Sequence, residues 1–322
     1  VLSYTVELPE GADKQDALKK LRQLEDEDPQ LRLEWNDVTK TIHIHLMGRV
    51  QTEVLTQLIR ERFELNVRIG AGGIAYKETI AVYGAGHFEP LRHYAEVHLL
   101  IEPSERGSGL RFESRCPTDE LDRNWQSLIM SELEAKTHLG VLTGSPLTDV
   151  KISLIAGKAH VKHTEGGDFR EAACRAVRQG LMKAQSVLLE PWYEFRIELS
   201  PEHIGRAISD IRAMSGKFDT EGSSVIVGTV PVSEMSGYAE TLASYTSGKG
   251  RISLRSAGYY PCHDAQRVIE TVGYEPESDL PNTPDSVFCS HGSGTIVKWS
   301  EADKFMHLDP AAERETAPAA PL

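Results

Sequence analysis

The fold begins with an alternating stretch, Leu2-Ser3-Tyr4-Thr5-Val6-Glu7-Leu8. Its even positions are apolar and its odd positions are polar, as in a strand with one buried face. Asp13 can cap a helix that follows this strand. Two alternating segments, a second helical stripe and a closing strand come next, so the order over about 70 residues is βαββαβ. The two predicted helical stripes are Ala17, Leu18, Leu21 and Leu24, then Val54, Leu55, Leu58 and Ile59.

The same order recurs nearer the C-terminus. Alternation from Tyr193 to Leu199 predicts a strand, and Ser200-Pro201 supplies a helix start. We therefore expect an α+β protein in which two ferredoxin-like βαββαβ domains flank a middle domain. The predicted boundaries are 1–80, 81–190, 191–258 and a C-terminal extension at 259–322, with a loop-like, Pro-rich stretch and a Pro/Ala tail that should be disordered.

Composition restricts the class of protein. The formal net charge is −13, which argues against a chain that coats nucleic acid with a uniformly basic surface. No apolar run is long enough to span a membrane. Four scattered cysteines favour a reducing cytoplasm. Because the chain starts at Val1 without an initiator Met, we interpret it as part of a longer protein.

Several ordered motifs carry a family resemblance. They are Gly48-Arg49-Val50-Gln51-Thr52-Glu53-Val54, Ala75-Tyr76-Lys77-Glu78-Thr79-Ile80, Leu147-Thr148-Asp149-Val150-Lys151, Asp168-Phe169-Arg170 and Leu188-Leu189-Glu190-Pro191. Over about residues 1–260 the chain resembles domains III, IV and V of elongation factor G and its relatives. In detail it is most similar to the tetracycline-resistance ribosomal protection proteins, which carry a comparable Thr-Asp-x-Lys strand and Asp-Phe-Arg helix start.

The resemblance implies an elongated arrangement, a left-handed βαβ fold for the middle domain, and binding to the ribosome in the cytoplasm. Its implied partners are the small-subunit decoding region, the factor-binding site and an N-terminal GTPase domain of the same protein. This sequence contains no GxxxxGK[ST] loop, so the chain itself is not expected to be a GTPase or to hold a cofactor. GTP and Mg²⁺ would bind in the N-terminal part.

The strongest candidate site is the segment from Gly157 to Gly167. Residues 151–183 contain seven Lys and Arg against three Asp and Glu, a local net charge of +4 in an acidic chain. Lysines can contact phosphates and histidines can stack on RNA bases. The predicted rRNA-binding residues are Lys158, His160, Lys162, His163, Thr164 and Arg170; by resemblance they form the domain IV tip, and His160 stands where elongation factor G has a histidine. A solvated loop with ordinary charges is the alternative interpretation.

One departure from the protection proteins concerns this tip. They place a Ser-Pro-Val-type stretch where this chain has Val161-Lys162-His163. The two readings within the class are therefore a tetracycline-resistance ribosomal protection protein and an elongation factor G paralogue that acts in translocation or ribosome remodelling.

Rivals from other classes use different residues. A zinc-dependent hydrolase could use Cys262, His263, Cys289 and His291, although their spacing matches no common zinc pattern, so no metal site is predicted. A scaffold that never touches RNA is a further alternative. The glycine-rich stretches Gly70–Gly73 and Gly84–Gly86 lack the spacing of a phosphate-binding loop, and we expect a hinge and a turn there.

Overall fold

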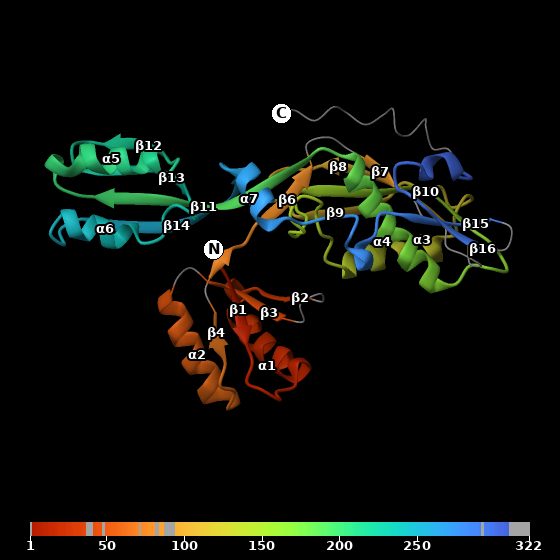
Figure 1. Ribbon diagram of the computed structural model, residues 1–322, viewed down its shortest axis with the longest axis horizontal. Helices are drawn as coiled ribbons and strands as arrows, with labels where there is room; N and C mark the ends of the chain where they lie inside the picture. Colours follow the sequence, from red (N-terminus) through yellow and green to blue (C-terminus); the bar gives the residue numbers. More distant parts are fainter. Residues whose placement is uncertain are drawn as a thin grey trace. The chain divides into compact units, whose positions relative to one another are not determined.

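The computed structural model describes residues 2–36, 41–46, 49–70, 72–80, 84–86, 94–290 and 293–308. It is an α+β protein, as predicted, and divides into two compact units. The first unit contains residues 1–75 and 190–260, and the second contains residues 76–189 and 261–322. Figure 1 shows the elements coloured along the chain.

The N-terminal part of the first unit has the predicted βαββαβ order. Its sheet order is β2-β3-β1-β4, with antiparallel pairing of β1 to β3 and of β2 to β3. Asp13 caps α1, since its carboxylate accepts a 2.8 Å hydrogen bond from the amide of Gln15. The elements are β1 (Leu2–Glu7), α1 (Lys14–Glu27), β2 (Leu33–Asn36), β3 (Thr41–Leu46), α2 (Arg49–Phe63) and β4 (Arg68–Ile69).

The apolar stripe of α2 is narrower than predicted. Leu55 and Ile59 are buried in the core with β1 and β3, whereas Val54 is 64% exposed and Leu58 is 41% exposed. Positions one residue apart are turned by about 100° around a helix, so in α2 the row of Val54 and Leu58 lies to the side of the row that faces the core.

Neither glycine-rich stretch is only a hinge or a turn. Gly73 and Ile74 form β5, which pairs with β1, and Gly84–Gly86 forms β7, which pairs with β8. Glycine at position 72 has a packing reason, because a Cβ there would lie 2.6 Å from the ring of Tyr4. The predicted turn at Gly84–Gly86 is therefore wrong.

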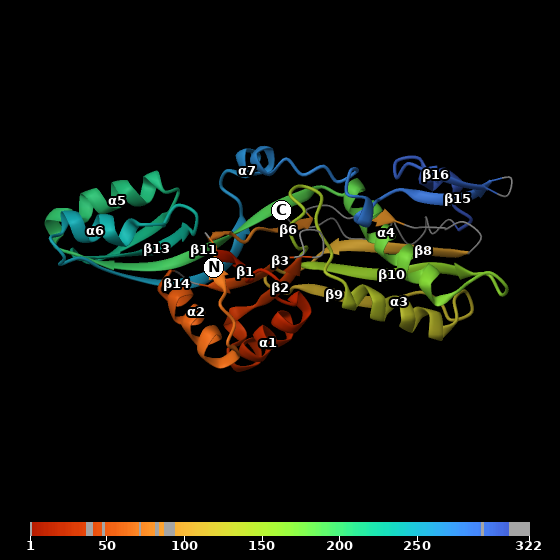
Figure 2. The ribbon, with the colours of Figure 1, turned by 60° about the horizontal axis from the view of Figure 1, so that its bottom comes forward.

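The second βαββαβ pattern also folds as predicted, with sheet order β12-β13-β11-β14. Ala207 and Ile211 of one helix and Leu242 of the other are buried against Phe195 and Ile197 of β11. Figure 2 shows both helices on one face of this sheet. The elements are β11 (Ser186–Glu198), α5 (Ile204–Ala213), β12 (Lys217–Glu221), β13 (Val225–Pro231), α6 (Tyr238–Tyr245) and β14 (Arg251–Pro261).

The second unit is built on a sheet of order β7-β8-β10-β9, in which only β9 and β10 are parallel. Helix α3 connects that parallel pair, which gives the expected βαβ unit. Phe169 and the alanines of α4 fill a core against β8 and β10. The elements are β6 (Lys77–Ile80), which pairs with the start of β11, then β7 (Gly84–Gly86), β8 (Ala95–Pro103), β9 (Leu110–Ser114), α3 (Arg123–Ala135), β10 (Val150–Ala159) and α4 (Gly166–Lys183).

The C-terminal extension has more regular structure than its sequence pattern indicates. Residues 262–308, called the C-terminal extension below, contain α7 (Ala265–Val272), the hairpin of β15 (Ser286–Ser290) and β16 (Ser293–Val297), and two short 3-10 helices. Side chains of α4 hold it, with Arg175 donating to the carbonyl of Asp285 and Gln179 to the carbonyl of Trp299. The predicted disordered tail lies outside the described residues.

Within the described part of the chain, no helix has the length and apolar character needed to cross a membrane.

Candidate functional site

The candidate site is the loop of residues 160–165, called the β10–α4 loop, which leaves β10 at Ala159 and enters α4 at Gly166. A capping box fixes the helix end of this loop. The Glu165 side chain accepts from the backbone of the first turn, and the amide of Glu165 donates to the Asp168 carboxylate at 2.8 Å.

Hydrogen bonds close the loop onto the start of β8. The amides of His163 and Thr164 both donate to the carbonyl of His160 at 3.1 Å, which makes a tight turn. The Thr164 hydroxyl donates to the carbonyl of Tyr94 and accepts a 2.7 Å bond from the amide of His160. Tyr94 in turn donates its amide to the carbonyl of His163. Thr164, predicted as a contact residue, therefore braces the base of the loop.

The tip of the loop projects its side chains into solvent. Val161 is 103% exposed, and Lys158, His160, Lys162 and His163 are all exposed. The two imidazole rings stack on one another with centroids 4.6 Å apart and an angle of 20° between their planes. A braced base with a projecting tip can present fixed groups to an external partner.

Local charge is concentrated at two lysines rather than at all seven predicted basic residues. Among the described residues, only Lys158 and Lys162 of the seven have neither a carboxylate within ion-pair distance nor a hydrogen bond from their charged groups. Lys158 places its Nζ 5.9 Å from the centroid of the Tyr94 ring, a cation–π contact. The others are engaged as follows: Lys151 with Glu102 and Glu113, Arg170 with Glu132, Arg175 with Glu171, Lys183 with Asp303, and Arg178 with the carbonyls of Leu139 and Gly140.

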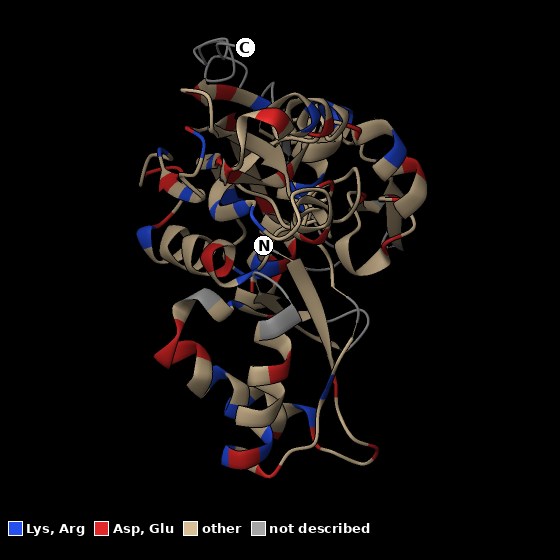
Figure 3. Cartoon of the chain, turned by 90° about the vertical axis from the view of Figure 1, so that its left-hand side faces the viewer, with Lys and Arg blue, Asp and Glu red and all other residues tan. Residues whose placement is uncertain are grey.

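Arg170 differs from the other predicted contact residues. Its Nε and Nη2 donate to the two carboxylate oxygens of Glu132, both at 2.9 Å. This bidentate pair raises the pKa of Arg170 and neutralises its charge locally. Figure 3 shows acidic and basic positions interspersed along the ribbon.

The weak metal candidates occupy two segments of the C-terminal extension. Cys262 is half-buried and His263 is exposed directly after β14, whereas Cys289 is exposed on β15. His291 lies outside the described residues. A four-ligand zinc site therefore stays a hypothesis.

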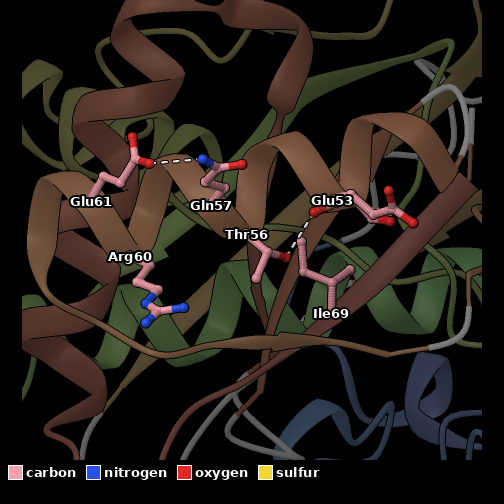
Figure 4. A pocket seen from close by; sticks show the side chains of 7 residues that line it. Glu53, Thr56, Gln57, Arg60, Glu61 and Ile69 are labelled. Carbon is pink, nitrogen blue, oxygen red and sulfur yellow. Dashed lines mark hydrogen bonds between the residues drawn. The ribbon is translucent and has the colours of Figure 1, made fainter.

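A groove of about 740 Å³ lies along α2 and is lined by Thr52, Glu53, Thr56, Gln57, Arg60, Glu61 and Ile69 (Figure 4). Two of its polar side chains are hydrogen-bonded within α2. Gln57 donates to the Glu61 carboxylate at 2.8 Å, and the Thr56 hydroxyl donates to the backbone carbonyl of Thr52 at 2.7 Å. None of the predicted site residues lines this groove.

Sequence reasoning missed Tyr94 and two buried carboxylates, Glu78 and Glu96. Both glutamates are fully buried. Glu78 lies inside a quoted motif, yet the backbone groups that bind it come from residues 142–145, about 65 positions away. No local periodicity reports such a contact, and of the three residues only Tyr94 could have been found from the sequence, because it is an aromatic residue directly before the alternating strand of residues 95–103.

Three family models match consecutive parts of the chain. Residues 1–71 match domain III of elongation factor G, residues 72–185 match its domain IV, and residues 187–268 match its C-terminus. The chain belongs to the elongation factor G family. Residues 269–308 of the extension lie past the last matched position.

Individual relatives agree with this assignment. The chain is 33% identical over 266 residues to the tetracycline resistance protein TetP of Clostridium perfringens, covering 80% of this chain and 41% of that one. It is 28% identical over 285 residues to elongation factor G of Dehalococcoides mccartyi strain CBDB1, covering 85% and 41%. A crystal structure from Thermus thermophilus aligns with a TM-score of 0.60 at 26% identity, covering 84% and 42%. The chain spans about two fifths of these proteins.

Proposed function

We propose that this chain is the ribosome-binding part of a translational GTPase and that its β10–α4 loop enters the decoding region of the small ribosomal subunit. The observation that carries the proposal is the braced loop with Lys162 at its exposed tip and Lys158, also exposed, beside it at the end of β10. Lysines at a narrow tip can contact closely spaced phosphates while the acidic remainder of the chain is kept away from them.

In this proposal the GTPase domain, with its GTP and Mg²⁺, is another part of a longer cytoplasmic protein and a partner of this chain. Hydrolysis there would drive release, while the loop acts sterically. The relative named tetracycline resistance protein supports ribosomal protection against tetracycline as the specific role. The relative named elongation factor G supports the second role, a paralogue that acts in translocation or remodelling.

Pelleting of the purified protein with bacterial ribosomes over a salt series tests the proposal. We expect binding that weakens as salt rises, and a log–log salt slope that is shallower by about 1 for each lysine removed. Lys158→Glu with Lys162→Glu should therefore release most of the bound protein near physiological salt.

The matched control is Lys19→Glu with Lys217→Glu, which changes net charge equally at exposed positions on α1 and β12. Equal pelleting of the two double variants at every salt concentration would overturn the role of the loop. A drug-susceptibility assay with the intact gene separates the roles, since only ribosomal protection raises the tetracycline concentration that a host tolerates.

A further inference from the structure

A chain of ring contacts extends the exposed tip. His163 stacks on His160, the His160 ring lies 6.4 Å from the Tyr94 ring, and the Tyr94 ring lies 5.6 Å from that of His307. These four residues, called the ring array below, come from the β10–α4 loop, the start of β8 and the C-terminal extension. The ammonium group of Lys158 lies beside the array, near the Tyr94 ring.

The carboxylate of Glu96 holds the array in place. This group is fully buried on β8 and accepts hydrogen bonds from the Tyr94 hydroxyl at 3.1 Å and from the amides of His307 and Leu308 at 3.3 and 2.9 Å. It also lies 2.7 Å from Nε2 of the buried His98. One carboxyl group thus fixes both Tyr94 and the main chain that carries His307.

The rings remain accessible although their backbone is fixed. His160, His163 and His307 are exposed, the last with 49% of its side chain in contact with solvent, and Tyr94 is half-buried. Exposed aromatic rings held in place carry a small entropic cost on binding, because their positions are set before the partner arrives.

We propose that the ring array is a stacking platform for unpaired RNA bases, with Lys158 contacting the adjoining phosphate. Aromatic and imidazole rings offer faces on which any base can stack, and this mode requires bases that are not already paired. The proposal rests on the proposed function and deepens it by naming Tyr94 and His307 as binding residues and unpaired RNA as the ligand. His307 lies in the C-terminal extension, past residue 268, where the last family-model match ends.

Fluorescence anisotropy with the purified protein and a labelled oligoadenylate of about 12 nucleotides tests the platform. A hairpin duplex of similar length serves as the comparison ligand. We expect the single strand to bind more tightly than the duplex, and His307→Ala to weaken single-strand binding by about fivefold or more. His307→Phe keeps a ring and should retain most of the affinity.

A 2-aminopurine base within the oligoadenylate reports stacking directly. Its fluorescence should be quenched by the wild type and by His307→Phe, but less by His307→Ala. His307→Ala should leave the salt slope unchanged, whereas Lys158→Glu should make it shallower. The control is His203→Ala, which removes a ring from the other unit and should alter neither affinity nor quenching.

Glu96→Gln tests how the array is positioned. Loss of the charged acceptor weakens the bonds to Tyr94 and to the His307 main chain, so single-strand binding should fall while the melting temperature of the folded protein remains measurable. Adding His307→Ala to this variant should cost less than it costs in the wild type, because both changes act through one contact.

Two sets of results are distinguishable. Wild-type affinity and quenching in His307→Ala, or equal affinity for the duplex and the single strand, would overturn the platform. If ribosome pelleting still depended on Lys158 and Lys162, the proposed function would stand. Absence of binding to both ribosomes and oligoadenylate would overturn both proposals.

Discussion

Two loops of the second unit differ in sequence and reach opposite structures. Residues 139–146, called the Glu78 loop below, contain two glycines, Thr143 and Ser145 among apolar residues and carry no charge, whereas the β10–α4 loop contains two histidines, Lys162 and Glu165. The Glu78 loop wraps its amides around a buried carboxylate, which accepts from the amides of Leu142 and Thr143 at 2.8 Å and of Ser145 at 3.2 Å. The β10–α4 loop instead projects charged and aromatic side chains outward. The loop without charged side chains thus uses its backbone to bind an acidic partner within the fold, and the loop with charged side chains presents them to solvent.

The largest expected effect is at the centre of the Glu78 loop. Glu78→Ala removes an acceptor used by three amides and the Thr143 hydroxyl, and leaves buried donors unsatisfied. We expect a loss of about 4 kcal/mol in the free energy of unfolding, measured by urea denaturation. Glu134→Ala, at an exposed position on α3, is the control and should change stability by less than about 0.5 kcal/mol.

A pair of glycine substitutions sharpens the contrast between the loops. A Cβ at Gly140 would lie 2.0 Å from the Glu78 carboxylate, whereas a Cβ at Gly167, in the first turn of α4, would meet nothing within 4 Å. Gly140→Ala should cost about 3 kcal/mol through overpacking, and Gly167→Ala should be neutral or slightly stabilising. Equal melting temperatures for the two variants would contradict this account.

Acid should weaken the Glu78 loop through the histidine that precedes it. Burial lowers the pKa of His138 to about 4, and its Nε2 hydrogen-bonds the carbonyl of Leu133 at 2.9 Å. Because the folded pKa lies below the unfolded value, this group costs no stability above about pH 6.5 and destabilises the fold progressively as pH falls toward 4.

Between pH 7 and pH 5 the loss from His138 should be about 2 kcal/mol. Urea denaturation of the wild type and of His138→Gln at both pH values measures it, since the variant lacks this proton uptake. A pH dependence as steep in the variant as in the wild type would exclude His138 as the cause.

The smallest effect is expected at the base of the β10–α4 loop. Thr164→Val keeps the shape of the side chain but removes the hydroxyl that joins His160 to Tyr94. We expect about 1 kcal/mol of destabilisation and faster amide hydrogen exchange at His160. Thr164→Ser keeps the hydroxyl and should restore protection; an unprotected amide in the serine variant would contradict the assigned bond.

The sequence predicted the repeated elements because each strand and helix of the βαββαβ units buries one face, and that face repeats with a fixed period. It also located the exposed tip, since lysine and histidine gather there. The sequence did not predict those features that depend on contacts between residues far apart in the chain. Glu96 and His98 sit at the polar positions of an alternating strand, yet both are buried, and the amides of His307 and Leu308 bind the Glu96 carboxylate.

The predicted basic cluster also depends on contacts with distant residues that the sequence does not show. Seven cations close in sequence predicted a charged surface, but Arg178 is buried and donates to two carbonyls, and Lys183 pairs with Asp303 far along the chain. Only folding decides which charges remain available for a partner.

The attachment of the C-terminal extension has a consequence for how the tip can change. Arg175, Gln179 and Glu96 all bind main-chain atoms of the extension, and Glu96 also lies 3.4 Å from Nδ1 of His307. A different side chain at position 307 would lose that one contact, but the hydrogen bonds to the main chain would still fix the path of the extension. Successive variants of one scaffold could in this way try different side chains beside the same loop.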